Sequence, residues 1–151
     1  DAAMTTDVIV GFPGESEEEF SESFSFIEEI RFYETHIFPY SKREGTRAAA
    51  MPEQVPGALK KRRAARLQAL NLGRQREFRT SRLGTTQEML SEETVTIDGQ
   101  AYLIGNSREY VKLAAPLSAL GGDCAVNCLY RGTAEKFLNS EILLLTNVSK
   151  T

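Results

Sequence analysis

Two short stretches of this 151-residue chain carry residue types suited to holding a ligand. One covers residues 11–15, directly after a predicted strand, and the other covers residues 39–43, at the end of the next predicted strand. Glycine lets a ligand approach the backbone closely, and a helix starting after Glu15 would favour a negative group at its N-terminus. Gly11 and Gly14 lack the lysine and the further glycines of common phosphate-binding and dinucleotide-binding loops. A tight turn without a ligand therefore remains the alternative.

The elements that must position these stretches follow from the residue pattern. Residues 7–10 form a β-branched run typical of a strand buried in a parallel sheet. Ser16 and Glu19 have the spacing of a capping box at a helix start. The apolar stripe of that helix comprises Phe20, Phe24, Ile27 and Ile30. With a second strand over residues 34–40, the pattern predicts one unit of an α/β barrel or layered sheet, whose strands end at one rim.

The net charge of −3 conceals three segments of different character. Residues 1–57 carry 12 acidic and 4 basic side chains. Residues 58–84 carry 1 acidic and 9 basic side chains, and residues 85–151 carry 8 acidic and 5 basic side chains. The bases of the middle segment are Lys60, Lys61, Arg62, Arg63, Arg66, Arg74, Arg76, Arg79 and Arg82. They could contact nucleic-acid phosphates, or they could pair with the acidic first segment on a solvated helix. The sequence leaves both readings open.

The second half changes from a long helix to short β segments. The helix is predicted over residues 57–83, with Gly73 as its weak point. Strands are predicted over residues 86–90, 94–97, 100–104, 110–114, 123–131 and 137–142, with a turn at Asp98-Gly99. Short strands at close spacing indicate a small barrel. The predicted division is therefore an α/β part at 1–57, a basic linker helix at 58–84, and a β-barrel with a tail at 85–151.

The cysteines and the single histidine favour structural roles. Cys124 and Cys128 have the first spacing of a CxxxCxxC cluster loop, but Arg131 occupies the third position. On a strand the two thiols would share one face, where they would behave as small core hydrophobes. His36 has no acid–base partner that the sequence identifies, and we expect it in or beside the second strand.

Residues 6–15, 36–46 and 51–56 closely resemble the methylthiotransferase branch of the radical S-adenosylmethionine enzymes. Within that branch, residues 38–46 are most similar to the tRNA threonylcarbamoyladenosine methylthiotransferases. Residues 83–142 resemble the TRAM domain, a small β-barrel that usually contacts the macromolecular substrate. The resemblance implies the C-terminal portion of a partial TIM-type α/β barrel followed by a small, OB-like all-β barrel.

The resemblance also implies an activity and its cofactors. Such enzymes use S-adenosylmethionine and two 4Fe-4S clusters to insert a methylthio group at C2 of N6-threonylcarbamoyladenosine, next to the anticodon. In this family, one wall of the barrel holds the adenosyl group of the cofactor, and the resemblance places Ile9, Gly11, Phe12, Phe38 and Tyr40 in that wall. The alternative is that these side chains only pack within the barrel. Arg43 and Thr46 would order the rim or face the substrate.

The chain departs from the family by lacking both sets of cluster cysteines. The resemblance therefore places no catalytic residue and no metal ligand in this chain, and we expect it to be inactive without an N-terminal part of the same protein. The RNA-binding candidates, for a tRNA anticodon stem-loop, are Arg74, Arg76, Arg79, Arg108, Lys112 and Arg131. The alternatives are a ribosomal-protein or isopentenyladenosine-tRNA methylthiotransferase, or a non-catalytic RNA-binding module. The sequence contains no membrane-spanning run, and we expect a cytoplasmic protein without membrane contact.

Overall fold

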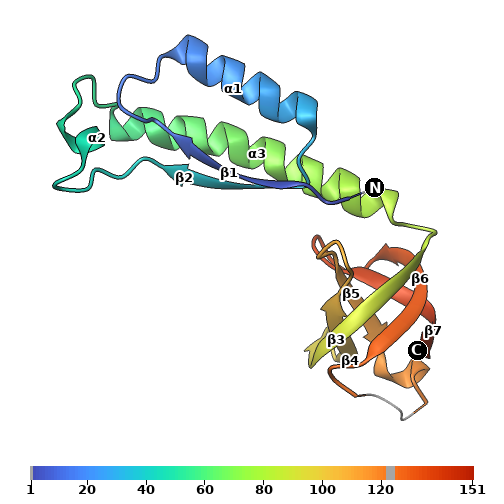
Figure 1. Ribbon diagram of the computed structural model, residues 1–151. Helices are drawn as coiled ribbons and strands as arrows, with labels where there is room; N and C mark the ends of the chain where they lie inside the picture. Colours follow the sequence, from blue (N-terminus) through green and yellow to red (C-terminus); the bar gives the residue numbers. More distant parts are fainter. Residues whose placement is uncertain (1, 122–124) are drawn as a thin grey trace. The chain divides into compact units, whose positions relative to one another are not determined.

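The computed structural model describes residues 2–121 and 125–151, which divide into two compact units. The first comprises Ala3–Gln75 and the second Arg76–Thr151, so the division falls inside one helix. Figure 1 shows the helices and strands of each unit. Among the helices of the described residues, none is long and apolar enough to cross a membrane.

The first unit is a parallel strand pair covered by helices. Its elements are β1 (Thr5–Val10), α1 (Glu17–Ile30), β2 (Glu34–Pro39), the short α2 (Arg47–Ala50) and most of α3 (Gly57–Ser81). The strands pair in register from Thr5 opposite Glu34 to Val10 opposite Pro39. Its core consists of Val10, Phe20, Ile27 and Leu67, with Phe24 packed against it. The predicted strand–helix–strand unit is confirmed, although Ile30 at the end of the stripe is exposed.

Helix α1 begins at the predicted capping box. The Ser16 hydroxyl accepts a hydrogen bond from the Glu19 N–H at 3.1 Å, and the Glu19 carboxylate accepts one from the Ser16 N–H at 2.8 Å. These bonds satisfy two backbone donors that a helix start would otherwise leave unpaired. Arg31, at φ 60°, ends the helix in the left-handed conformation.

Helix α3 contacts β2 at three points along its length. The Lys60 ammonium donates to the Tyr40 carbonyl at 2.8 Å, just beyond the end of the strand. The Asn71 side chain accepts from the Thr35 N–H at 2.8 Å, and Gln75 donates to the Glu34 carboxylate at 3.1 Å. Helix side chains thereby bond to polar groups at both ends of β2, one of the known ways of covering a strand edge.

The second unit is a closed five-stranded barrel. Its strands are β3 (Thr86–Ile97), β4 (Gln100–Asn106), β5 (Lys112–Pro116), β6 (Leu129–Phe137) and β7 (Leu143–Lys150), with a 3₁₀ turn η1 at Leu117–Ala119. The strand order is β3-β4-β5-β7-β6, and β5 and β7 are the parallel pair. The predicted small barrel is confirmed.

Several predicted strands of this unit differ in the structure. Segments 86–90 and 94–97 are one strand, β3, bent by a bulge between Ser91 and Glu93. The strand predicted over 123–131 is correct only from Leu129, where β6 begins; residues 125–128 form a turn, and residues 123 and 124 lie outside the described part of the chain. The piece predicted at 137–142 is wrong, because β6 ends at Phe137 and the unassigned tail forms β7.

The prediction of a cysteine on a strand face is wrong for Cys128 for the same reason. Cys128 is half-buried in a turn before β6 and not on a strand face, while Cys124 lies outside the described residues. The turn is held by the buried Ser91, whose single hydroxyl hydrogen lies within hydrogen-bond reach of the carbonyls of Ala125 and Cys128 and whose oxygen accepts from the Cys128 N–H. These bonds span 34 and 37 residues, and no local pattern predicts them.

Candidate functional site

The carboxyl ends of β1 and β2 form a rim where both predicted ligand stretches meet. The Tyr40 N–H donates to the Val10 carbonyl at 2.8 Å, which ties the two strand ends together. The Phe12 and Tyr40 rings pack edge to face, with their centroids 5.3 Å apart. The Lys60 ammonium lies 5.6 Å from the centre of the Tyr40 ring. The sequence predicted the two aromatic residues here, but it did not indicate Lys60.

Helix α3 leaves no room for a side chain at Gly11. Its φ of 72° is left-handed, and a Cβ there would collide with the Cγ and Cδ atoms of Lys60. The Gly11 N–H donates to the Glu15 carboxylate at 2.6 Å, which closes the turn. We predicted that glycine would allow a ligand to approach the backbone, but at this position the approaching group is the Lys60 side chain.

A buried arginine fixes the same turn from the helix side. Arg63 is 1% exposed, and its guanidinium donates to both the carbonyl and the carboxylate of Glu15. It also donates to the Glu17 carboxylate at 3.2 Å and lies 5.2 Å from the centre of the Phe20 ring. A buried charge is costly unless it is paired and hydrogen-bonded, and Glu15 and Glu17 meet that need.

The face of the strand pair opposite the helices carries the remaining cofactor candidates. Ile9 and Phe38 lie directly opposite each other in the register and are 57% and 52% exposed, whereas Val8 packs toward the core. The Tyr40 hydroxyl oxygen is buried and has no hydrogen-bond partner among the described residues. An exposed apolar pair and a buried hydroxyl without a partner are both typical of ligand-binding surfaces.

Thr46 orders the loop after β2 through its side chain, which agrees with the first of the two alternatives given for Arg43 and Thr46. The Thr46 hydroxyl donates to the Arg43 carbonyl at 2.7 Å and accepts from the Ala49 N–H at 3.3 Å. Thr46 thereby caps α2 and fixes the loop after β2. The Arg43 side chain is exposed.

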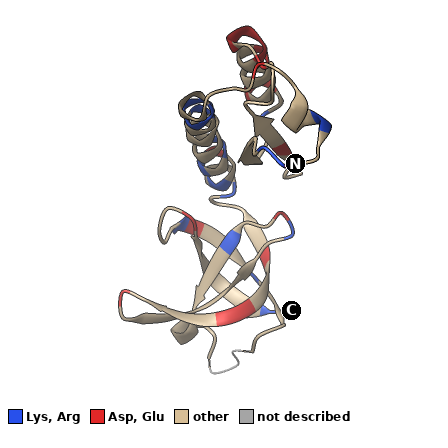
Figure 2. Ribbon diagram, turned by 90° about the vertical axis from the view of Figure 1, so that its left-hand side faces the viewer, with Lys and Arg blue, Asp and Glu red and all other residues tan. Residues whose placement is uncertain are grey.

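The basic side chains of α3 are extensively engaged within their own units. Figure 2 shows them along the helix, and acidic residues on α1. Arg66 pairs with Glu17 at 3.1 Å, and Arg74 donates to the Glu28 carbonyl at 2.9 Å. Arg76 lies 5.4 Å from the Phe137 ring centre, and Arg79 donates to the Ser140 carbonyl at 3.3 Å. Part of this segment therefore pairs with the acidic first segment, one of the two readings of its charge.

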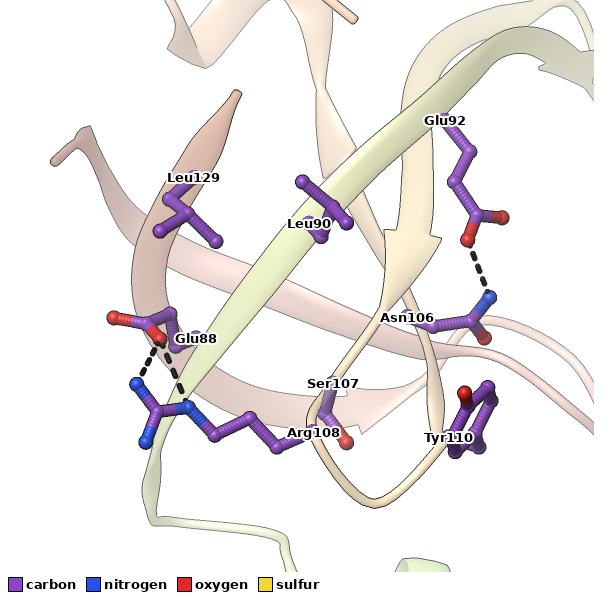
Figure 3. A pocket seen from close by; sticks show the side chains of 8 residues that line it. All are labelled: Glu88, Leu90, Glu92, Asn106, Ser107, Arg108, Tyr110 and Leu129. Carbon is purple, nitrogen blue, oxygen red and sulfur yellow. Dashed lines mark hydrogen bonds and ion pairs between the residues drawn. The ribbon is translucent and has the colours of Figure 1, made fainter. Parts of the chain in front are cut away.

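One basic candidate of the barrel, Arg108, lines a hollow of about 400 Å³ on the barrel surface (Figure 3). Arg108 donates to one Glu88 oxygen through Nε at 3.2 Å and Nη2 at 2.9 Å. Arg131 lies opposite Glu88 in the β3–β6 register, and Lys112 lies opposite Asn106. The hollow is lined by Glu88, Leu90, Glu92, Asn106, Ser107, Arg108, Tyr110 and Leu129. Sequence reasoning missed its apolar members.

No metal centre is assembled within the part of the chain that the structure describes. No group of three or more His, Cys, Asp or Glu side chains in residues 2–121 and 125–151 is arranged to hold a metal ion. The rim residues are instead aromatic, aliphatic and glycine residues, a set suited to an organic ligand.

Comparison with known proteins gives a consistent result. The chain is 43% identical over 112 residues to the threonylcarbamoyladenosine tRNA methylthiotransferase MtaB of Bacillus subtilis, covering 74% of this chain and 25% of that protein. It is 50% identical over 93 residues to the tRNA-2-methylthio-N(6)-dimethylallyladenosine synthase of Corynebacterium urealyticum, covering 62% and 17%. The synthase of the same name from Desulfitobacterium hafniense is 36% identical over 139 residues, covering 81% and 31%. No protein-family model matches the chain.

These similarities run through both units, because the longest match covers 81% of the chain. The chain belongs to the radical S-adenosylmethionine methylthiotransferases. It spans about a quarter of the length of the curated relatives that it matches.

Proposed function

We propose that this chain is part of a tRNA methylthiotransferase and forms one side of its cofactor site and a substrate-binding barrel. The proposed reaction adds a methylthio group to C2 of N6-threonylcarbamoyladenosine, next to the anticodon. The observation that carries the proposal is the rim at the ends of β1 and β2, and the similarity of the chain to relatives named as tRNA methylthiotransferases supports it. In this proposal, the α/β-barrel part covers residues 1–57, the linker helix covers residues 58–84, and the TRAM-like domain covers residues 85–151.

The rim residues fit the adenosyl part of S-adenosylmethionine. Ile9 and Phe38 offer an exposed apolar surface, Phe12 and Tyr40 an aromatic corner, and the Tyr40 hydroxyl an unsatisfied hydrogen-bonding group. The cofactor supplies radical chemistry together with the 4Fe-4S clusters, whose ligands we place elsewhere in the protein. Gly11 fixes the turn, so its contribution is to hold the backbone of the rim in place.

The relatives name two target nucleosides, which differ in the group on N6. The threonylcarbamoyladenosine enzyme matches 74% of this chain at 43% identity, and the two dimethylallyladenosine synthases match 62% at 50% and 81% at 36%, so these figures do not rank the two nucleosides. We place threonylcarbamoyladenosine first because residues 38–46 most resemble that branch of the family. The dimethylallyladenosine enzyme is the second candidate.

Nucleoside analysis tests the proposal directly. Deleting the gene that encodes this chain and digesting bulk tRNA should abolish the methylthio form of threonylcarbamoyladenosine in the mass spectrum, with its unthiolated precursor accumulating. Complementation with the full-length gene should restore it. Loss of the methylthiolated dimethylallyl nucleoside instead would establish the second candidate, and an unchanged set of methylthio nucleosides would refute both.

Replacing Tyr40 with phenylalanine should separate stability from cofactor binding. The buried hydroxyl has no protein partner among the described residues, so its removal should stabilise the protein by about 1 kcal/mol. If that hydroxyl bonds to the cofactor, S-adenosylmethionine affinity should fall severalfold. Thermal unfolding without cofactor and equilibrium dialysis of the full-length enzyme measure the two effects. Unchanged cofactor affinity would remove the Tyr40 hydroxyl from the site.

The basic side chains would bind the anticodon stem-loop of the tRNA. We assign this role to Arg74, Arg76 and Arg79 of the helix and to Arg108, Lys112 and Arg131 of the barrel. Their intramolecular bonds are largely exposed and cost little to exchange for phosphate contacts.

A further inference from the structure

The hollow on the barrel surface has an apolar floor and one aromatic side chain. Leu90 on β3 and Leu129 on β6 lie opposite each other in the register, and they are 47% and 41% exposed. Tyr110, from the loop between β4 and β5, is 79% exposed. Figure 3 shows the strands and the loop that bring these side chains around the hollow. Clustered exposed apolar side chains beside a concave surface mark an interaction site.

The backbone of Tyr110 is held in an unfavourable conformation. Its φ of 60° lies in the left-handed region, which is uncommon for a bulky residue. The loop is fixed by Ser107, whose carbonyl accepts from the Tyr110 N–H at 3.0 Å and whose hydroxyl accepts from Glu109 and Val111 N–H groups. The Ser107 N–H also donates to the Val111 carbonyl at 2.9 Å. Strain held in place by several bonds is characteristic of functional positions, and here it fixes the loop that carries an exposed ring.

The polar groups around the hollow are mutually paired. The Glu88 carboxylate accepts two hydrogen bonds from Arg108 and has Arg131 opposite it on β6. The Asn106 amide donates to Glu92 at 2.9 Å. The lining contains two carboxylates, of which Glu88 is bonded to Arg108 and Glu92 accepts from Asn106, so the exposed apolar floor is left for an uncharged planar group.

We propose that this hollow binds a single unstacked nucleobase of the RNA substrate, with the base on Leu90 and Leu129 and stacked against the Tyr110 ring. The site lies on β3, the end of β4, the β4–β5 loop and the start of β6. OB-type barrels bind oligonucleotides on the face of their second and third strands and on the loops that follow the first and fourth strands. The hollow therefore adds a separate contact that selects an unpaired nucleotide. This inference rests on the proposed tRNA substrate.

The test replaces Tyr110 with asparagine, which removes the ring but suits a left-handed backbone position, so the barrel should still fold. The full-length enzyme is titrated by fluorescence anisotropy with an RNA hairpin that has an unpaired loop and with a blunt duplex of equal charge. Loss of one base–aromatic stack should weaken hairpin binding about tenfold and leave duplex binding unchanged. Tyr110→Phe keeps the ring and should bind like the wild type.

A matched control and the contrary outcomes complete the design. Phe26→Ala removes an exposed aromatic ring from α1, 59% exposed, and should leave hairpin affinity unchanged. Equal hairpin affinity of Tyr110→Asn and the wild type would overturn the base site while leaving the proposed function intact. The same would follow if the variant lost affinity for an arginine-rich peptide but not for RNA. If the wild-type enzyme bound neither RNA and left tRNA nucleosides unchanged, the proposed function itself would fail.

Discussion

Replacing Arg63 with methionine should destabilise the first unit by about 3–5 kcal/mol, the cost of removing one partner from a buried ion pair. Methionine keeps much of the apolar stem against Phe20 but leaves the half-buried Glu15 carboxylate without the guanidinium. Urea unfolding of the chain, combined with amide hydrogen exchange at Val10 and Phe20, measures the loss in this unit separately. The exchange of barrel amides such as Leu103 should be unaffected.

Two companion variants identify the cause of the Arg63 effect. Glu15→Gln in the Arg63→Met background removes the uncompensated charge but keeps an acceptor for the Gly11 N–H, so part of the stability should return. Arg62→Met removes a neighbouring base that is 67% exposed and 3.7 Å from Glu17, and should cost less than about 0.5 kcal/mol. If the Arg62 and Arg63 variants were equally stable, the buried pair would not be what holds the turn.

Gly11→Ala should destabilise the same unit by about 3 kcal/mol. Roughly 1–2 kcal/mol comes from placing a Cβ at φ 72°, and about 1–3 kcal/mol from its collision with the Lys60 stem. The variant should also weaken S-adenosylmethionine binding in the full-length enzyme, because Lys60 would have to move away from Tyr40. Denaturant unfolding and equilibrium dialysis measure the two effects.

The chain offers an opposite control for this glycine. Gly73 lies inside α3 with open space around its Cβ position among the described residues, so Gly73→Ala should stabilise the protein by about 0.5–1 kcal/mol. Adding Lys60→Ala to Gly11→Ala should remove the collision but not the backbone strain. A Gly11→Ala protein as stable as the wild type would show that the Lys60 contact does not require glycine.

The first unit was predictable where its signals are local. The capping residues Ser16 and Glu19 lie three positions apart, and the strands carry their β-branched and aromatic residues in short runs, so both elements appear where the pattern indicates. Within the rim, Phe12 and Tyr40 were also predicted, since they directly follow the two strands. Each of these signals is contained within a few residues of the position that it describes.

Lys60 and Arg63 were not predictable, although both belong to a conspicuous basic run. Arg63 bonds to Glu15 across 48 residues, and Lys60 to Tyr40 across 20. The sequence pattern does not distinguish Arg62 from Arg63, yet Arg62 is exposed and Arg63 is almost fully buried. Only the rotation of α3 against the sheet distinguishes them, and that rotation depends on tertiary packing.

The barrel errors have a related cause. The alternating residues before Leu129 match a strand, but bonds from the buried Ser91 hold Ala125 and Cys128 in a turn, and Asn127 adopts a φ of 56°. Likewise, nothing near Tyr110 indicates that Ser107 holds it in a left-handed conformation. A period-two pattern predicts a strand only where a neighbouring strand accepts its hydrogen bonds.

The contacts of α3 with β2 impose a constraint on length. Lys60, Asn71 and Gln75 are separated by 11 and 4 residues, so they fall on one stripe of the helix, with three turns between the first two. One inserted or deleted residue between Lys60 and Asn71 would turn the later part of the stripe by about 100° and break its match to the strand. Exposed residues in this part of the helix can therefore be exchanged, but the number of residues between Lys60 and Asn71 cannot change.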